Sequence, residues 1–312
     1  MNHKIDTKLY DLLSFKNPDA ILKEIKHILS IITCYNNFKS LDQAYEDTVK
    51  LFNGLYPGFS ASNTKYHDLE HSASTALTVT RLIHGCIAEG YSFDPQKIFM
   101  GISAALFHDV GLIQTIDDTE GTGAKYTIGH EKRSIDFFTK YFKDKNYSLS
   151  LIDDSALYIQ CTILNLPPKQ IPFKSEESRS IGYIIGSSDL LTQISDRNYL
   201  EKLILLFKEF EEAGIPDFES ELDLLRKTER FYNEVAQKRL FQDFEGICSH
   251  MKSHFRQRWG LDKDLYSEAI ASNIEYIKRL ANICKEAYEC YLDNLKRGGI
   301  SETFIKGKNK NT

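Results

Sequence analysis

Apolar side chains recur with helical spacing along much of this 312-residue chain. Between Leu69 and Ile87 they return every three or four residues, which predicts an amphipathic helix. A second helix is predicted to begin at Asp94-Pro95, because aspartate caps helices and proline suits their first turn. Its apolar residues cover almost the whole circumference as far as Phe107, which indicates a buried helix.

This second helix is expected to end at His108-Asp109-Val110-Gly111, where Gly111 can supply a left-handed terminal residue. The polar stretch Gln114–Thr127 is interpreted as a loop. Before residue 60, helices are expected to break near Asn17-Pro18 and Tyr56-Pro57. Further helices are predicted near residues 128–142, 148–164, 181–194, 199–213, 218–240 and 265–295, with a surface crossing over residues 165–180.

Composition supports an all-α fold. Only seven prolines are present, and segments rich in Leu, Ile, Glu and Lys recur along the chain. Apolar residues make up 42% of the sequence, which is enough for a substantial core. We therefore predict a compact multi-helix bundle with a helical C-terminal extension.

The net charge and the absence of long apolar segments limit the kinds of partner that we expect. The net charge of -5 argues against duplex nucleic acid as a partner. No run of eighteen apolar residues and no secretory signal pattern is found, so no membrane partner and a cytoplasmic location are expected. The cysteines form no CxxC pair and are interpreted as reduced thiols; they are Cys34, Cys86, Cys161, Cys248, Cys284 and Cys290.

Four short segments carry candidate chemistry, each on or beside an apolar helix. A carboxylate that closes or interrupts a buried helix is costly unless it is paired or binds a cation. Each segment alone has an ordinary explanation, such as a capping histidine or an aspartate paired with an arginine. The segments are Tyr66-His67-Asp68-Leu69-Glu70-His71, His108-Asp109, Gly129-His130 and the lone Asp189.

Taken together, these segments give an ordered series of histidines and aspartates. If a helix starts between His67 and His71, His67 lies at its N-terminus and His71 lies inside it. Imidazole nitrogen and carboxylate oxygen suit divalent Mn, Fe, Zn or Mg. Cysteine is absent from all four segments, which argues against a structural zinc site.

The series resembles the HD superfamily of metal-dependent phosphohydrolases, and the spacing of His67 and His71 resembles the class I cyclic-nucleotide phosphodiesterases. The resemblance covers about residues 60–200. It implies two divalent ions and hydrolysis of a nucleotide phosphodiester by metal-activated water. His67 would be the general acid and Asp109 would bridge the ions. The implied metal ligands are His71, His108, Asp109, His130 and Asp189, of which His130, as in bacterial HD-type phosphodiesterases, would serve the second ion.

Lys125, Arg133 and Arg197 are candidates to meet phosphate oxygens. The double histidine and Gly-Tyr-Pro signature of the cyclic-dinucleotide group are absent, which disfavours that substrate and a diiron oxygenase. An HD-type nucleotidase, or phosphomonoesterase, and a non-catalytic helical binding module stay open.

The expected organisation has four parts. Residues 1–60 are a helical segment packing on the core, 61–200 the metal-binding catalytic core, 201–300 further helices of the same body and 301–312 a polar tail. The expected partner is a small-molecule nucleotide, and a homodimer is left open.

Overall fold

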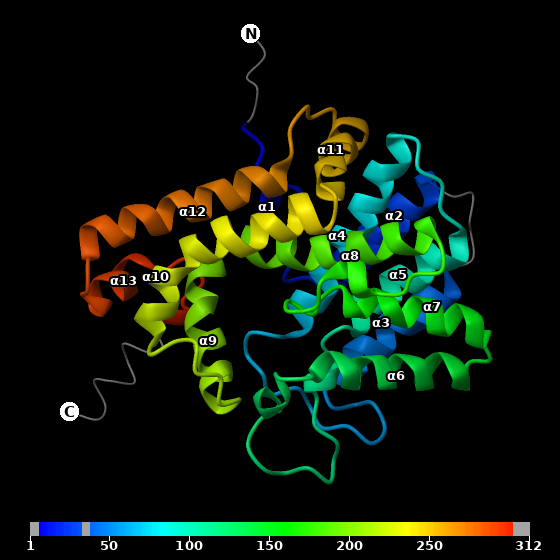
Figure 1. Cartoon of the computed structure of the whole chain (residues 1–312), viewed down its shortest axis with the longest axis horizontal. Coiled ribbons are helices and arrows are strands. Elements are labelled where there is room, and N and C mark those ends of the chain that lie inside the picture. Colours follow the sequence, from blue (N-terminus) through cyan, green and yellow to red (C-terminus); the bar gives the residue numbers. More distant parts are fainter. Residues whose placement is uncertain (1–5, 33–37, 302–312) are drawn as a thin grey trace.

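The computed structural model describes residues 6–32 and 38–301, which form helices joined by loops and contain no β-strand (Figure 1). The all-α prediction is therefore confirmed. Antiparallel bridges join Asn53 to Ala61 and Phe59 to Thr115. The α-helices are α1 (Leu9–Leu12), α2 (Pro18–Ile32), α3 (Lys39–Phe52), α4 (Leu69–Ala88), α5 (Pro95–Phe107), α6 (His130–Asp144), α7 (Leu149–Gln160), α8 (Glu176–Ser195), α9 (Tyr199–Glu212), α10 (Glu221–Phe231), α11 (Met251–Trp259), α12 (Leu265–Cys284) and α13 (Tyr288–Asn294).

Helix α4 lies at the centre of the bundle and packs against α2, α5, α8 and α11. Every residue from His71 to Cys86 is buried, because neighbouring helices cover α4 on all sides. Helices α9, α10 and α13 gather at one end, whereas α3, α5, α6 and α7 gather at the other (Figure 1). The central position of α4 and α8 brings their polar residues into the interior.

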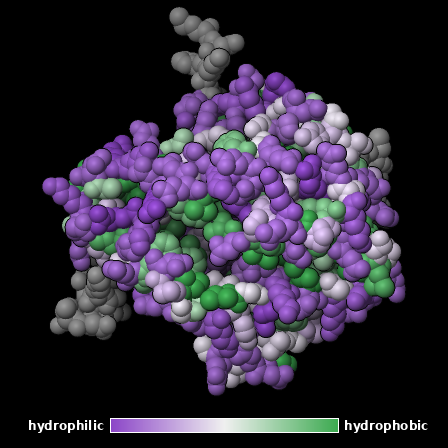
Figure 2. All heavy atoms as spheres, viewed as in Figure 1, coloured by the Kyte–Doolittle hydropathy of each residue, from purple (hydrophilic) through white to green (hydrophobic). Residues whose placement is uncertain are grey.

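One hydrophobic cluster runs through the described chain, from Leu9 in α1 to Leu295 after α13. The face in Figure 2 is mostly hydrophilic, with hydrophobic side chains gathered in a hollow. None of the described helices combines the length and apolar character needed to cross a bilayer.

Gly111 differs from its predicted role. Helix α5 ends at Phe107, and Gly111 lies inside a 3-10 helix, Val110–Leu112, with no positive φ. The glycine is instead required for a close approach, since a Cβ there would lie 2.0 Å from the carbonyl oxygen of His130. The left-handed assignment was wrong because tertiary contact, and not helix termination, selects this glycine.

Several helix boundaries also differ from the prediction, notably those of α8 and α12. Helix α8 begins at Glu176, five residues before the predicted residue 181, because the Ser175 side chain accepts a hydrogen bond from the backbone N–H of Ser178. The predicted helix over residues 265–295 breaks after Cys284, where Lys285 adopts a φ of 50°.

The same break explains a disulfide that the sequence interpretation missed. The reversal after α12 brings the Cα atoms of Cys284 and Cys290 to 5.4 Å, and their sulfurs are bonded. Cys86, Cys161 and Cys248 are free and buried, as expected, whereas Cys34 lies outside the described residues.

Candidate metal centre

The start of α4 positions the first two histidines. Asp68 caps the helix, and its Oδ1 accepts a hydrogen bond from the backbone N–H of His71 at 2.8 Å. The Thr64 hydroxyl donates to the carbonyl oxygen of His67 at 2.8 Å and fixes the preceding turn. His67 therefore lies outside the helix and His71 lies in its first turn. This matches the expectation for a helix that starts between the two histidines.

Two further histidines are oriented by backbone carbonyls. His108 Nδ1 lies 2.8 Å from the carbonyl oxygen of Ala105, and His130 Nδ1 lies 2.8 Å from that of Thr127. A carbonyl only accepts, so in the neutral ring that binds a metal Nδ1 carries the proton and Nε2 keeps its lone pair. This is how proteins commonly orient a histidine that binds a metal.

Four predicted ligands converge on one point. His71 Nε2 lies 3.3 Å from His108 Nε2 and 3.1 Å from Asp189 Oδ1. Asp109 Oδ2 lies 3.1 Å from His108 Nε2 and 3.4 Å from His71 Nε2. The buried group His71, His108 and Asp109 has the mutual spacing of a metal site. Two imidazoles and two carboxylates suit a borderline divalent ion.

The two oxygens of Asp109 face different partners. Oδ2 faces His71 and His108, and it is buried with no hydrogen-bond partner among the described residues. Oδ1 lies 3.2 Å from His130 Nε2. A buried carboxylate oxygen without a donor is costly, so a cation between these ligands fits the site. Asp109 therefore faces His71 and His108 through one oxygen and His130 through the other.

The electrostatics also favour a cation. Burial raises the pKa of Asp109, but the positive charge of His108 outweighs burial and holds that pKa well below its usual range. Burial lowers the pKa of His108, yet Asp109 and Asp189 raise it well above normal. The centre therefore carries ionised carboxylates whose negative charge a divalent ion would neutralise.

The sequence interpretation did not single out Glu209, which lies on α9 and is buried. Its Oε2 lies 2.6 Å from His67 Nδ1, and its Oε1 accepts the backbone N–H groups of Lys65 and Tyr66 at 2.8 and 2.7 Å. Burial lowers the pKa of His67, but Glu209 and Asp109 outweigh it and raise that pKa to about 9. The only signal in the sequence was an acid on the buried face of a predicted helix.

The three candidate phosphate-binding cations lie in different surroundings. Lys125 contacts Asp118 Oδ1 at 2.5 Å in its own loop. Arg133 Nε donates to the carbonyl oxygen of Gly111 at 2.6 Å, which supports the turn after Asp109. Arg197 alone lines a cavity that His71 also lines.

Replacement of Gly111 by alanine is expected to destabilise the fold and to shift His130 relative to Asp109. The new methyl group would meet the backbone of His130 and also the backbone nitrogen of Ser134 at 2.8 Å, so α6 must move. We expect a loss of about 1–3 kcal/mol of unfolding free energy, the usual cost of overpacking. Thermal denaturation measures it. Gly101→Ala, whose methyl would meet only side chains of Ile181 and Ile185, is the control and should cost less. An unchanged melting temperature for Gly111→Ala would contradict this close contact.

A family model described as Npun_R2479-like matches residues 17–246 of the chain. The match covers α2 to α10 and includes every residue of the histidine–aspartate centre and Glu209. No curated protein matches the chain.

Proposed function

The chain belongs to the Npun_R2479-like family, and from the geometry of its histidine–aspartate centre we propose that it is a metal-dependent phosphohydrolase that cleaves a phosphodiester of a nucleotide. The split orientation of the Asp109 carboxylate carries this proposal, because a bridging carboxylate is what a two-ion centre requires. The resemblance to the HD and cyclic-nucleotide phosphodiesterase superfamily supports it.

In this proposal the centre would hold two divalent ions of Mn, Fe, Zn or Mg. His71, His108, Asp109 and Asp189 would hold the first ion, and Asp109 with His130 would hold the second. Bound divalent ions supply Lewis acidity that activates water and neutralises charge on phosphoryl oxygens. The second position has fewer protein ligands, which leaves room for substrate oxygen.

His67 would protonate the leaving oxygen. Its ring centroid lies 6.1 Å from that of His71 and 6.0 Å from that of His130, so it faces the centre without joining the ligands. Glu209 binds Nδ1 and therefore leaves Nε2 as the proton donor. The charge of Glu209 keeps this ring protonated at neutral pH.

Metal content and hydrolysis of bis(p-nitrophenyl) phosphate test this function together. We expect the purified protein to bind a divalent metal, to release nitrophenolate when manganese is present and to lose turnover in chelator. Release of inorganic phosphate from mononucleotides, without diester cleavage, would favour the nucleotidase. Oxygen consumption by an iron-loaded protein would favour the oxygenase, and failure to hydrolyse any phosphoester with any added metal would contradict the phosphohydrolase proposal.

A further inference from the structure

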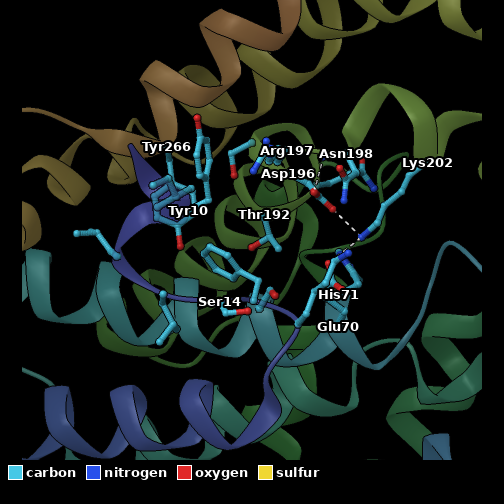
Figure 3. A pocket seen from close by; sticks show the side chains of 18 of the residues that line it. Tyr10, Ser14, Glu70, His71, Thr192, Asp196, Arg197, Asn198, Lys202 and Tyr266 are labelled. Atoms are coloured by element: carbon cyan, nitrogen blue, oxygen red, sulfur yellow. Dashed lines mark hydrogen bonds and ion pairs between the residues drawn. The ribbon is translucent and has the colours of Figure 1, made fainter. Parts of the chain in front are cut away.

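A cavity of about 560 Å³ lies beside His71 (Figure 3). The segment Leu9–Lys16 crosses one side of it, and the first turns of α4 form another. The end of α8, residues 196–198 and α12 complete the wall. Small-molecule sites typically enclose about 300–1,000 Å³, so the cavity is large enough for a substrate.

Tyr66 joins this cavity to the candidate metal centre. Tyr66 lines the cavity, and its ring lies 4.8 Å from the ring of His67, centroid to centroid. Tyr66 is 4% exposed, and its hydroxyl is buried without a hydrogen-bond partner among the described residues. An unpaired buried hydroxyl is costly. A ligand oxygen or nitrogen in the cavity would satisfy it.

The charged side chains of the lining balance in number, since it contains the cations Lys16, Arg197 and Lys202 and the anions Asp11, Glu70 and Asp196. Lys202 Nζ lies 2.6 Å from Asp196 Oδ2 and 3.2 Å from Glu70 Oε1, so two carboxylates neutralise it. The guanidinium of Arg197 lies over the ring of Tyr10, 4.9 Å from its centroid. The lining therefore offers no net positive charge to an anionic group of a ligand. This argues for an uncharged group in the cavity.

Neutral hydrogen-bonding and aromatic groups dominate the remaining lining. Gln193 and Asn198 add carboxamides, which donate and accept in one plane and so match the edge of a heterocycle. Tyr10 and Tyr266 add aromatic rings, on which planar rings stack. The Tyr266 hydroxyl is fixed by Arg81 Nη1 at 3.0 Å and by Thr78 Oγ1 at 2.9 Å, and Arg81 itself lies behind the lining.

We propose that this cavity binds the leaving alcohol of the phosphoester, that the alcohol is an uncharged ring compound of nucleoside size, and that the Tyr66 hydroxyl donates a hydrogen bond to it. The segment Leu9–Lys16 is then the wall that selects the alcohol. This inference rests on the proposed function, because the cavity meets the candidate metal centre through His71 and Tyr66.

Calorimetric titration of the manganese-loaded protein with uncharged nucleosides tests the cavity without turnover. We expect at least one of adenosine, guanosine, cytidine and uridine to bind. Tyr66→Phe, which removes only the hydroxyl, should weaken that binding about tenfold, the effect of one buried hydrogen bond. Tyr10→Ala should weaken it by a similar factor, because a wall and its stacking surface are lost.

Two matched variants serve as controls. Tyr158→Phe removes a fully buried hydroxyl from α7, and Tyr91→Ala removes a tyrosine that is 39% exposed, against 45% for Tyr10. Neither tyrosine lines the cavity, so both variants should bind nucleoside as the wild type does.

The outcomes separate the cavity from the chemistry. The cavity assignment would be overturned if the protein hydrolysed phosphodiesters but bound no nucleoside. It would also be overturned if Tyr66→Phe and the wild type bound nucleoside equally. Either result would leave the proposed function standing. Tighter binding of nucleoside diphosphates through the cavity, lost in Arg197→Ala, would overturn the uncharged class. Nucleoside binding that depends on Tyr66, without any hydrolysis, would support the cavity and contradict the proposed function.

Discussion

Asp109→Asn is expected to abolish metal binding and phosphodiester hydrolysis together. Asparagine keeps the size of the side chain but replaces one carboxylate oxygen with an amide donor. That donor would face either His71 and His108 or, in the other orientation of the amide, His130. Both proposed ion positions therefore lose a charged ligand at once. Loss of a single orienting partner already costs about 10–100-fold in metal affinity, so removal of the shared ligand should cost more. Asp109→Ala should have the same outcome.

Elemental analysis and thermal denaturation measure the effect of Asp109→Asn. A metal at 100 times its dissociation constant stabilises the folded state by about 2.7 kcal/mol. Manganese should therefore raise the melting temperature of the wild type by several degrees and leave that of Asp109→Asn unchanged. Asp47→Asn is a suitable control, because Asp47 is also a buried aspartate and accepts a hydrogen bond from the Tyr141 hydroxyl, away from the centre. A metal-loaded, active Asp109→Asn protein would refute the ligand assignment.

His67→Ala is expected to keep the metal and to lose about 10²–10⁴-fold in kcat, the usual contribution of a general acid. His67 contacts Glu209 and none of the four converging ligand atoms, so the metal content should stay at the wild-type value. The loss should depend on the leaving group. An alkyl alcohol needs a proton as it leaves, whereas p-nitrophenolate needs little assistance.

Comparison of a p-nitrophenyl ester with an alkyl ester of the same phosphate measures this dependence. His250→Ala is the control, since His250 contacts Tyr91 and lies outside the centre. Equal losses for both leaving groups would show that His67 positions the substrate and does not donate a proton. Near-full turnover of the alkyl ester by His67→Ala would contradict a role for His67 in the reaction.

Glu209→Gln extends this test to the pH profile. Glu209 raises the pKa of His67, so its neutralisation should lower that pKa. The protonated, donating form of His67 would then be lost at lower pH. The alkaline limb of the kcat profile should accordingly move to lower pH, with metal content unchanged. A limb that stays in place would show that another group sets it.

Local patterns in the sequence were enough to predict the helical architecture and the order of the candidate ligands. Helical periodicity, the Asp94-Pro95 start and the apolar run to Phe107 are local properties, so they predict α4 and α5 well. The positions of His71, His108, Asp109 and Asp189 on or beside buried helices were also readable, because a polar group in an apolar run is visible in one dimension.

Which groups meet depends on how distant segments of the chain pack together. Glu209 lies 142 residues from His67, and no local pattern connects them. Arg133 differs from Arg197 only in what surrounds it, and those surroundings assign one to the Gly111 turn and the other to the cavity. The close approach at Gly111 and the wall formed by residues 9–16 depend in the same way on packing between distant segments. Periodicity records which face of a helix is buried, whereas the identity of the neighbour on that face depends on how the helices pack.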